Sequence, residues 1–409
     1  MGPPIVPRGR IGSRIATLMA DRQRRDTSND AWWRDRGGYT TIMPISARLF
    51  FNGKFYAGGT NGVHRVADRL LRELDALAVA GEAPAEWDMR LLLPARPTWA
   101  PAFARIVPVP QRLGHSQLWE QAILPFAART GVLASFANLA PGLHGAKLTM
   151  VHDAQFRLSP ESYPAKLRWG YRLLVPRGAS SSRVVLTVSD YARDSLATFG
   201  IAPAAITQVL HNGADHVLET AADPSVLTTH RLVPGGYTLM FGSVADYKNV
   251  AVVFAAYARG RIDLPLVVIG PSRATLEAAG LHPPAGAVFV GGVDDAGLRA
   301  LYEGAHCLLY PSRTEGFGLP PVEAMLCDCP VVAAPAGAIP EICRDAVVYA
   351  GMDDAAEWEC AVLTLARPEW RAAKIAAGRA RAATFTWAAA GGRLAVILET
   401  LLATAKPAR

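Results

Sequence analysis

The sequence lacks the long apolar runs that a membrane-spanning protein needs. Across its 409 residues, no apolar stretch reaches the roughly 18 consecutive residues that cross a bilayer. The first 25 residues contain several arginines, but they have no long apolar core and no convincing signal-peptidase site. We therefore expect a cytoplasmic protein without a secretory signal.

Metal-binding signatures are also missing. The five cysteines all lie between residues 307 and 360, and Cys327 and Cys329 form C-x-C instead of paired C-x-x-C motifs, which argues against zinc. No D-x-D pair is present, which disfavours a carboxylate-bound metal that carries a nucleotide diphosphate. We expect no metal and no tightly bound cofactor, and we expect the cysteines to be buried free thiols.

Apolar residues are plentiful, at 51% of the chain against 19% charged residues. Together with the length, this composition predicts two domains with substantial cores. Strand-like runs such as 264–270 (LPLVVIG) and 330–335 (PVVAAP) recur between helical segments. This alternation indicates an α/β fold.

Charge is unevenly distributed along the chain. Residues 1–232 carry 27 basic and 18 acidic residues, whereas residues 233–409 carry 15 and 17. The positive first part suggests an anionic partner, such as nucleic acid, a membrane surface or a phosphorylated acceptor. Because only 6 of the 42 basic residues are Lys, an arginine-rich coding bias without a binding role is an alternative.

The chain divides into an extension and two alternating series of strands and helices. Residues 1–42 are basic and lack periodicity, so we expect a disordered N-terminal extension. The first series runs from residue 43 to about 215, the second runs from 237 to 351, and the turn-rich stretch 216–236 separates them. The intervals between strands suit parallel sheets. We infer two Rossmann-like, doubly wound parallel-sheet domains, whose ligands bind beyond the carboxyl ends of the strands.

Two strand ends in the first series carry polar residues. Residues 146–153 predict a strand that ends in His152 and Asp153, where a histidine can hydrogen-bond a sugar or balance charge. A purely structural histidine is the alternative. Residues 183–200 predict a strand followed by a helix, with Ser189 as the N-cap.

Two glycine-containing loops follow predicted strands. Residues 57–66 (AGGTNGVHRV) form a loop whose backbone N–H groups can approach a phosphate or sugar, with a plain tight turn as the alternative. The chain contains neither G-x-G-x-x-G nor G-x-x-x-x-G-K-[ST], so dinucleotide and P-loop interpretations have little support. In residues 241–249 (FGSVADYKN), Lys248 lies near a helix N-terminus, where the dipole disfavours a cation. A bound diphosphate would offset that cost, whereas an exposed lysine head is the alternative.

The stretch 314–326 (TEGFGLPPVEAML) contains two carboxylates eight positions apart, Glu315 and Glu323. It follows a predicted strand, and its two prolines suit a first helical turn. The backbone amides of residues 316–319 would then point at phosphate oxygens. A carboxylate can accept hydrogen bonds from two hydroxyls, which suits a ribose or sugar diol. We expect both acids to face one crevice, with a simple helix-capping glutamate as the alternative.

These residues resemble a known family. Glu315 to Glu323 matches the E-x7-E motif of retaining GT-B glycosyltransferases of glycosyltransferase family 4 (the group 1 family), and 313–350 resembles the family's most characteristic block. The stretches LMFGSVADYKN and VFVGGVDDAGLRALYEGAHCLLYPS resemble its diphosphate-binding and base-binding segments. In the first domain, TNGVHRV, WEQAILP, VHD, TVSDYAR and LHNGADH resemble family landmarks. The similarity spans about residues 43–405, so the extension lies outside it.

The resemblance implies a GT-B fold, with an interdomain cleft between the two Rossmann-like domains. It implies an N-terminal acceptor-binding domain at 43–232 and a nucleotide-sugar-binding domain at 233–385. A C-terminal helix at 386–409 is expected to cross back onto the first domain.

The resemblance also implies roles for single residues. Glu315 would contact the transferred sugar, His152 would contact the donor near the reacting carbon, and Lys248 would neutralise the departing diphosphate. These three are the expected catalytic residues, and Glu323 would bind the ribose. The other expected donor-binding positions are Gly242, Ser243, Gly291, Val293, Gly316, Phe317, Gly318 and Leu319, and the expected acceptor or phosphate loop contains Gly59, Gly62 and Arg65.

One departure from the family pattern concerns the diphosphate. Many relatives have an Arg immediately before the Lys, and some have another after the first glycine. Here these positions hold Tyr247 and Ser243. Neutralisation of the diphosphate charge then depends on Lys248 and helix dipoles. Arg313 is a candidate to compensate for the missing arginines.

The expected activity is that of a retaining, metal-independent hexosyltransferase. Its first-domain pattern resembles polysaccharide mannosyltransferases, so GDP-mannose is the leading donor. The acceptor would be a glycan or a polyprenyl-diphosphate-linked glycan in exopolysaccharide or lipopolysaccharide biosynthesis. The basic first domain would suit peripheral attachment to the anionic inner face of the cytoplasmic membrane.

Two other function classes remain open from the sequence. A nucleotide-sugar epimerase or a glycan phosphorylase would use the same fold for a different reaction. A basic nucleic-acid-binding protein is a further alternative, but apart from Trp32 and Trp33 the aromatics are not interleaved with the basic residues. We therefore expect no nucleic-acid partner.

Overall fold

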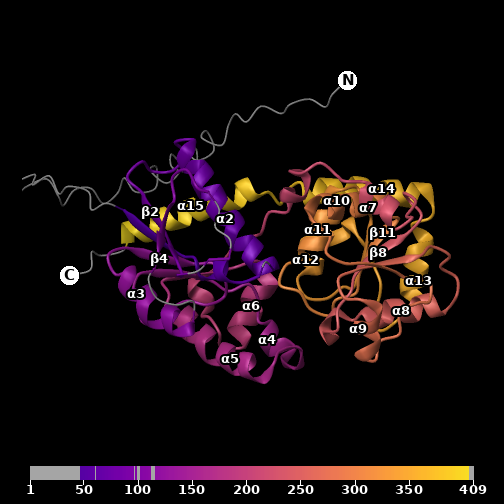
Figure 1. Cartoon of the computed structure of the whole chain (residues 1–409), viewed down its shortest axis with the longest axis horizontal. Coiled ribbons are helices and arrows are strands. Elements are labelled where there is room, and N and C mark those ends of the chain that lie inside the picture. The colour runs from indigo at the N-terminus through magenta and orange to yellow at the C-terminus, as the bar shows by residue number, and fades with distance from the viewer. Residues whose placement is uncertain (1–46, 60, 96, 99–101, 112–115, 405–409) are drawn as a thin grey trace, which may run out of the picture.

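The computed structural model describes residues 47–404, except 60, 96, 99–101 and 112–115. The proposed extension at 1–42 therefore lies outside the described residues. Within the described part, the chain forms two separate parallel sheets, each with helices on its faces (Figure 1). This architecture confirms the predicted fold class of two Rossmann-like domains.

The first domain is built on a seven-stranded parallel sheet of order β3-β2-β1-β4-β5-β6-β7. Its strands are β1 (Arg48–Asn52), β2 (Asp88–Leu93), β3 (Val107–Pro110), β4 (Val132–Ser135), β5 (Lys147–Met150), β6 (Val184–Thr187) and β7 (Thr207–Val209). Its α-helices are α2 (Gly62–Val79), α3 (Leu124–Ala127), α4 (Gln155–Leu158), α5 (Ala165–Ser180) and α6 (Asp190–Thr198), whereas α7 (Ser225–Thr229), which follows in the chain, packs against the second domain (Figure 1). The short turns of helix are η1 (Lys54–Ala57), the π-helix η2 (Trp119–Ile123), η3 (Pro160–Ser162), η4 (Ala204–Ile206) and η5 (Asp215–Leu218).

The second domain is built on a six-stranded parallel sheet of order β10-β9-β8-β11-β12-β13. Its strands are β8 (Thr238–Phe241), β9 (Leu266–Ile269), β10 (Val288–Val290), β11 (Cys307–Tyr310), β12 (Val331–Ala333) and β13 (Val348–Tyr349). Its helices are η6 (Asp246–Lys248), α8 (Val250–Ala258), α9 (Arg273–Ala278), α10 (Asp295–Gly304), α11 (Leu319–Leu326), α12 (Ile339–Cys343), η7 (Arg344–Ala346), α13 (Ala355–Thr364) and α14 (Pro368–Ala382).

The last helix, α15 (Trp387–Thr404), returns to the first domain and lies along α2 (Figure 1). Its apolar residues Leu394, Leu398 and Leu401 are buried. Among the described residues, the continuous stretch Pro368–Thr404 is the one helical region long and apolar enough to suggest a membrane span by composition. Because α15 buries Leu394, Leu398 and Leu401 against the first domain, the core of the protein accounts for part of that composition.

Most strands fall where the apolar runs predict them. All six strands of the second sheet lie inside predicted runs, because a parallel strand covered on both faces is continuously apolar. These runs are residues 237–242, 264–270, 287–292, 306–311, 330–335 and 346–351. Three strands of the first sheet were missed: β3, β4 and β7. β3 contains two prolines, and it is tolerated as a strand because it lies at the sheet edge.

Two further predictions from the sequence concern the N-cap at Ser189 and the state of the cysteines. Ser189 is the N-cap of α6, since its side chain accepts a hydrogen bond from the amide of Ala192, as predicted. Four cysteines are buried free thiols, as predicted. For Cys360 the prediction was wrong, because this residue of α13 is exposed.

Adjacent glycines in α15 give a matched test of its packing on α2. A Cβ on Gly391 would lie 2.4 Å from Cβ of Glu73, whereas a Cβ on Gly392 would have no neighbour within 4 Å. We predict that Gly392→Ala stabilises the protein, because Ala is favoured over Gly in a helix by about 1 kcal/mol. Gly391→Ala should destabilise it, because overpacking costs about 1–3 kcal/mol. Urea unfolding of both variants measures this, and shifts of the same sign would contradict the packing.

Candidate functional site

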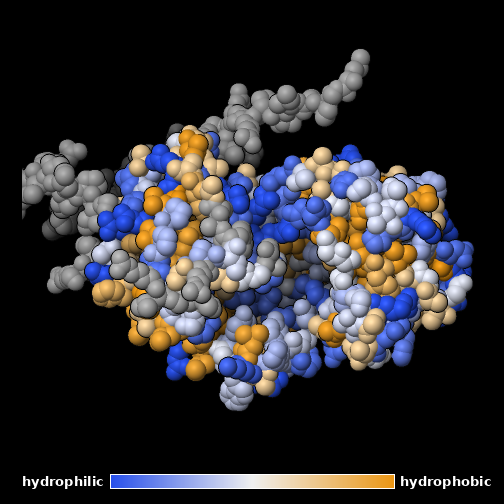
Figure 2. Space-filling model, viewed as in Figure 1, coloured by the Kyte–Doolittle hydropathy of each residue, from blue (hydrophilic) through white to orange (hydrophobic). Residues whose placement is uncertain are grey.

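The candidate site lies between the two domains, where the carboxyl ends of both parallel sheets meet. Figure 2 shows the surface hollowed between the domains, with hydrophilic side chains along much of the hollow. The loops that follow β5 and β6 reach it from the first domain, and those that follow β8 and β11 reach it from the second. Open parallel sheets bind ligands at such strand ends.

An ion pair between Lys248 and Glu315 lies at the centre of this region. Lys248 ends the turn η6 after β8, and Glu315 lies on the loop between β11 and α11. The Nζ atom of Lys248 donates to Oε1 of Glu315 at 2.7 Å, and both side chains are largely buried. Burial opposes the charged lysine, but the carboxylate of Glu315, with Tyr247 and Asp153, raises the pKa of Lys248 above its usual value. The site thus keeps a cation at the mouth of the cleft.

The loop that carries Glu315 packs directly against the first domain. A Cβ on Gly316 would lie 2.9 Å from the carbonyl oxygen of His152 and 2.9 Å from Cβ of Asp153. The hydroxyl of Ser189 donates to the carbonyl of Gly316 at 2.6 Å, while it also caps α6. Glycine is therefore required here by close approach, and the contact places Glu315 beside the end of β5.

His152 is buried and electrically neutral in this structure. Its Nε2 atom lies 2.8 Å from the carbonyl oxygen of Phe136, so Nε2 carries the proton and Nδ1 is the acceptor. Burial lowers the pKa of His152 to about 4. Asp153 lies near both Glu315 and Lys248, and burial raises its pKa above the usual range. A neutral imidazole can form a hydrogen bond with a sugar hydroxyl, but it carries no charge with which to balance an anion.

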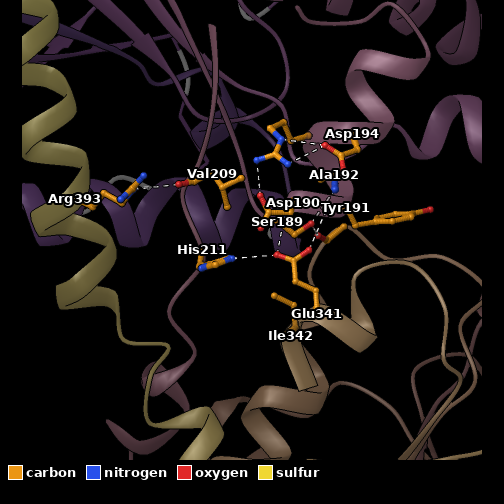
Figure 3. A network of polar contacts seen from close by, with 12 residues as sticks. Ser189, Asp190, Tyr191, Ala192, Asp194, Val209, His211, Glu341, Ile342 and Arg393 are labelled. Carbon is orange, nitrogen blue, oxygen red and sulfur yellow. Dashed lines mark hydrogen bonds and ion pairs between the residues drawn. The ribbon is translucent and has the colours of Figure 1, made fainter. Parts of the chain in front are cut away.

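A second interdomain contact centres on Glu341 of α12 (Figure 3). Its carboxylate accepts from the backbone amides of Asp190 and Tyr191, both at 2.9 Å, and lies 3.3 Å from Nε2 of His211. It thereby caps the N-terminus of α6, which belongs to the other domain. Although burial opposes it, these hydrogen bonds hold the pKa of Glu341 below its usual value. Glu341 and Gly316 therefore fasten the second domain to the same helix.

Glu323, the second acid of the E-x7-E motif, lies deeper than expected. Its side chain is buried, and it accepts from the hydroxyl of Tyr302 at 3.0 Å. Its other oxygen lies 3.1 Å from Nε2 of His216. Since Trp387 donates its indole N–H to Nδ1 of His216, the proton of that imidazole lies on Nε2 and points at Glu323. The two acids therefore occupy different environments instead of equivalent positions in one crevice.

Arg65 of α2 reaches across to the second domain. It forms an ion pair with Asp295 at 2.8 Å and lies close enough to Glu323 for that carboxylate to support its charge. Asn61 caps α2 by accepting from the amide of His64, so the predicted loop ends in a regular helix start. Gly59 and Gly62 have open space where a Cβ would lie, and Gly59 offers its carbonyl to Nδ1 of His64.

The remaining predicted donor-binding positions follow strands of the second sheet. Gly242 leaves β8 where a Cβ would lie 2.6 Å from Val268, and the Ser243 hydroxyl accepts from the amide of Ala245. Gly291 and Val293 lie between β10 and α10. Gly318 adopts a φ of 91° as the N-cap of α11, which begins at Leu319.

The side chains of Phe317 and Arg313 are both engaged within the protein. The ring of Phe317 is buried edge-on against Phe385, 5.4 Å between centroids, which leaves its backbone for the contact expected of it. Arg313 donates to Asn249 at 3.1 Å and forms an ion pair with Asp353. Its guanidinium is therefore held by these two residues and does not reinforce Lys248.

The first-domain side of the cleft contains a cavity of about 250 Å³ that residue-by-residue analysis of the sequence did not single out. Glu120 of η2 is buried there, and it accepts from Lys54 at 2.7 Å and from Asn52 at 2.8 Å. His64 and Tyr171 of α5 complete its polar lining. Burial raises the pKa of Tyr171, and the carboxylates of Glu120 and Asp153 add to this.

The structure thus brings Glu315, Lys248, His152 and Gly316 together and places Glu323 with Arg65 nearby. Sequence reasoning missed Glu120, Lys54 and Glu341, and it placed Asp153 at the strand end beside His152 without giving it a role of its own. Asn52 ends β1 and Lys54 begins η1, and Glu120 belongs to the quoted segment WEQAILP, so strand-end position and motif membership were available signals. Among the described residues, no group of three His, Cys, Asp or Glu side chains is placed to hold a metal.

Comparison with known proteins assigns the second domain. Residues 234–364 match the family model described as "Glycosyl transferases group 1". The chain is 30% identical over 59% of its length to "O-antigen chain mannosyltransferase B" of Escherichia coli, covering 66% of that protein. It is 25% identical over 52% of its length to "O-antigen chain mannosyltransferase RfbU" of Salmonella typhimurium, covering 58% of it. The chain therefore spans less than two thirds of the length of each of these curated relatives.

A solved structure supports the fold over most of the chain. Sucrose-phosphate synthase from Thermosynechococcus elongatus aligns with a TM-score of 0.68 at 16% identity, over 88% of this chain and 100% of that one. At this identity the likeness shows the fold alone, which is the two-domain GT-B arrangement of glycosyltransferases. Together with the family match, it shows that residues 234–364 of this chain form a glycosyl transferases group 1 domain.

Proposed function

We propose that this chain is a retaining glycosyltransferase that moves mannose from GDP-mannose to a hydroxyl of a glycan or a polyprenyl-diphosphate-linked acceptor in cell-surface polysaccharide biosynthesis. The observation that carries the proposal is the Lys248–Glu315 pair, 2.7 Å apart, at the strand ends of a group 1 domain. The similarity to two O-antigen mannosyltransferases supports the sugar and the pathway class.

The donor would bind mainly to the second domain. Its diphosphate would lie against Lys248 and the amides of residues 316–319, at the start of α11. Its base would lie near Gly291 and Val293, and its ribose would bind near Glu323. Because Glu323 is held by Tyr302 and His216, ribose binding requires one of these hydrogen bonds to be exchanged for a ribose hydroxyl.

Transfer would begin with cleavage of the bond between the anomeric carbon and the β-phosphate oxygen. Negative charge then develops on the departing diphosphate, and Lys248 opposes it where it develops. Glu315 holds Lys248 in place in the unliganded protein and, once phosphate occupies the lysine, is free to accept from sugar hydroxyls. His152 presents a neutral imidazole to the sugar.

The acceptor hydroxyl would attack from the face that the diphosphate leaves, so the anomeric configuration is retained. Its proton would pass to the departing phosphate, and no side chain is assigned as general base. Lys248 and the helix N-termini supply charge stabilisation from the chain's own groups, which supports a transfer that is independent of metal.

The cavity beside Glu120 would hold the acceptor's terminal sugar. A buried carboxylate paired with one lysine retains acceptor capacity for hydroxyl groups, and Tyr171 adds a further hydrogen-bonding side chain to the lining of the same cavity. The cavity volume of about 250 Å³ is comparable to the smallest ligand sites of proteins, of about 300 Å³. The acceptor would thus be held by the first domain while the donor is held by the second.

Removal of the lysine charge tests the proposed chemistry. We predict that Lys248→Met lowers the transfer rate by about a hundredfold or more, because preorganised charge at a developing anion contributes that much. The measurement is the transfer of labelled mannose from GDP-mannose to alkyl mannosides, with NMR to establish the anomeric configuration. Lys374→Met, which removes a partly buried lysine of α14 that donates to the carbonyl of Asp345, is the matched control. Unchanged transfer in Lys248→Met, or an inverted product, would contradict the mechanism.

A panel of nucleotide sugars tests the donor. We predict that GDP-mannose raises the unfolding temperature more than UDP-glucose or ADP-glucose does at equal concentration, because ligand stabilisation follows affinity. The shift should be reduced in Lys248→Met. A larger shift with a uridine or adenine nucleotide would overturn the assignment of the base, and interconversion of the donor without acceptor would indicate an epimerase.

The cavity makes a separate prediction about the acceptor. Glu120→Gln keeps the side-chain shape but removes the charge, so we predict an acceptor KM at least about tenfold higher, since hydrogen bonds to charged groups contribute about 1.5–3 kcal/mol. The thermal shift with GDP-mannose should be unchanged. Glu161→Gln, at an exposed position on η3, is the control. An equal loss of donor binding would show that Glu120 acts on the fold rather than on the acceptor.

A further inference from the structure

The first domain carries apolar side chains that its core does not use. On α5, Trp169 and Leu173 are 68% and 55% exposed. They are four residues apart, so they lie on the same face of the helix. Leu167 in the first turn is also exposed. Buried neighbours such as Val175 and Ala179 occupy the other side, which packs into the domain. The outward face of α5 is therefore apolar without being needed for folding.

A second group of exposed apolar residues lies beside α5. Leu118 immediately before η2, Phe126 on α3 and Leu143 on the loop after β4 are 71%, 67% and 90% exposed. The intervening loop connects both groups, since the carbonyl of Ala140 accepts from Gln121 of η2 at 3.2 Å and lies against Gly178 of α5. Figure 2 shows hydrophobic surface along this edge of the first domain, where Figure 1 places α3.

We call this surface the apolar edge, and it consists of Leu118, Phe126, Leu143, Leu167, Trp169 and Leu173. Its chemistry matches a bilayer interface more closely than a protein partner, because large apolar side chains alternate with basic ones. Residues 116–183 contain eight basic and three acidic residues. Of the three acids, Glu120 is buried in the cavity and Asp153 lies in the cleft, which leaves Glu161 exposed.

The exposed basic residues lie on the same elements as the apolar edge. Lys166, Arg172 and Arg177 are exposed on α5, and the guanidinium of Arg129 lies 4.2 Å from the ring centre of Phe126. Tryptophan and leucine enter the headgroup region of a bilayer, while arginine and lysine stay at anionic headgroups. Positive charge with almost no exposed acid favours anionic lipid over a neutral surface.

The opposite side of α5 faces the candidate site. Tyr171, two residues from Trp169 and Leu173, lines the cavity beside Glu120. One helix thus separates the apolar edge from the cavity. If the acceptor is lipid-linked, as in the proposed function, a bilayer on this edge would bring the acceptor's sugar to the cavity without extracting its lipid.

We propose that the apolar edge is a docking surface for an anionic lipid bilayer. The partner is the lipid surface itself, and binding needs neither the nucleotide sugar nor the acceptor. The apolar side chains insert and the four basic residues contact the headgroups, so binding requires both groups and weakens with salt.

Flotation of the full chain with lipid vesicles tests the proposal. The probes are vesicles of phosphatidylcholine alone and vesicles with about a third phosphatidylglycerol, an anionic fraction that raises affinity for basic interfacial helices. We expect binding to the anionic vesicles, little binding to the neutral ones, and release at high salt. The double variant Trp169→Ser/Leu173→Ser should bind the anionic vesicles at least about tenfold more weakly, because it removes buried apolar area from the membrane-bound state. Arg172→Gln/Arg177→Gln should weaken binding and its salt dependence together.

Controls separate the surface from the fold. Trp370→Ser removes a 47% exposed tryptophan from α14 of the second domain and should bind as the unaltered chain does. Trp169→Phe should retain binding but lose the quenching of tryptophan fluorescence by brominated lipid, which covers the case in which the double variant does not fold.

The proposal is overturned if the Trp169→Ser/Leu173→Ser variant binds anionic vesicles like the unaltered chain, or if the unaltered chain binds neither vesicle. It is also overturned if ultracentrifugation shows a dimer that this variant loses, since a second copy would then cover the edge. Because vesicle binding is measured without donor or acceptor, a chain that binds lipid but transfers no sugar would refute the proposed function and leave this surface standing.

Discussion

The approach of Gly316 to the end of β5 is the contact on which the site depends. No side chain fits between Gly316 and the backbone of His152 and Asp153, and the hydroxyl of Ser189 fixes the carbonyl of the glycine. This contact lays the loop of one domain on the strand end of the other. Because Glu315 immediately precedes Gly316, this contact holds the carboxylate of Glu315 beside Lys248 and close to the end of β5, where His152 lies. Glu341 supports the same geometry from α12, because it caps the helix that Ser189 begins.

The two acids of the E-x7-E motif have different partners in the folded protein. Glu315 forms a largely buried ion pair with a lysine, and a phosphate can replace it as the lysine's partner. Glu323 is buried between Tyr302 and His216, and His216 in turn accepts from the indole of Trp387 at the start of α15. The proposed ribose site is therefore linked to the helix that returns to the first domain. Donor binding at Glu323 would therefore affect the hydrogen bonds that connect the second domain to the start of α15.

Helix α5 places its side chains in two different environments. Tyr171 contributes to the polar cavity, whereas Trp169 and Leu173 face outward beside basic residues. The excess of positive charge in the first domain then has a specific location, and it lies close to the proposed acceptor cavity. A domain that holds a lipid-linked acceptor and a domain that holds a nucleotide sugar have different charge requirements, which agrees with the uneven charge of the chain.

Patterns in the sequence were enough to predict the two α/β domains, the positions of the second sheet's strands, the cap at Ser189 and the glycine loops at strand ends. These features depend on residues that are neighbours in sequence, and apolar runs, caps and glycines report on them directly. The short or proline-containing strands β3, β4 and β7 escaped because their stability comes from neighbouring strands rather than from their own pattern. Only the tertiary structure decided that Lys248 pairs with Glu315, 67 positions away, that Gly316 meets Ser189 across 127, and that Glu341 caps α6 across 151. It also decided that Glu323 is buried and that Glu120 lines a cavity, because burial of a charge depends on what packs around it, and that packing is fixed only when distant segments meet.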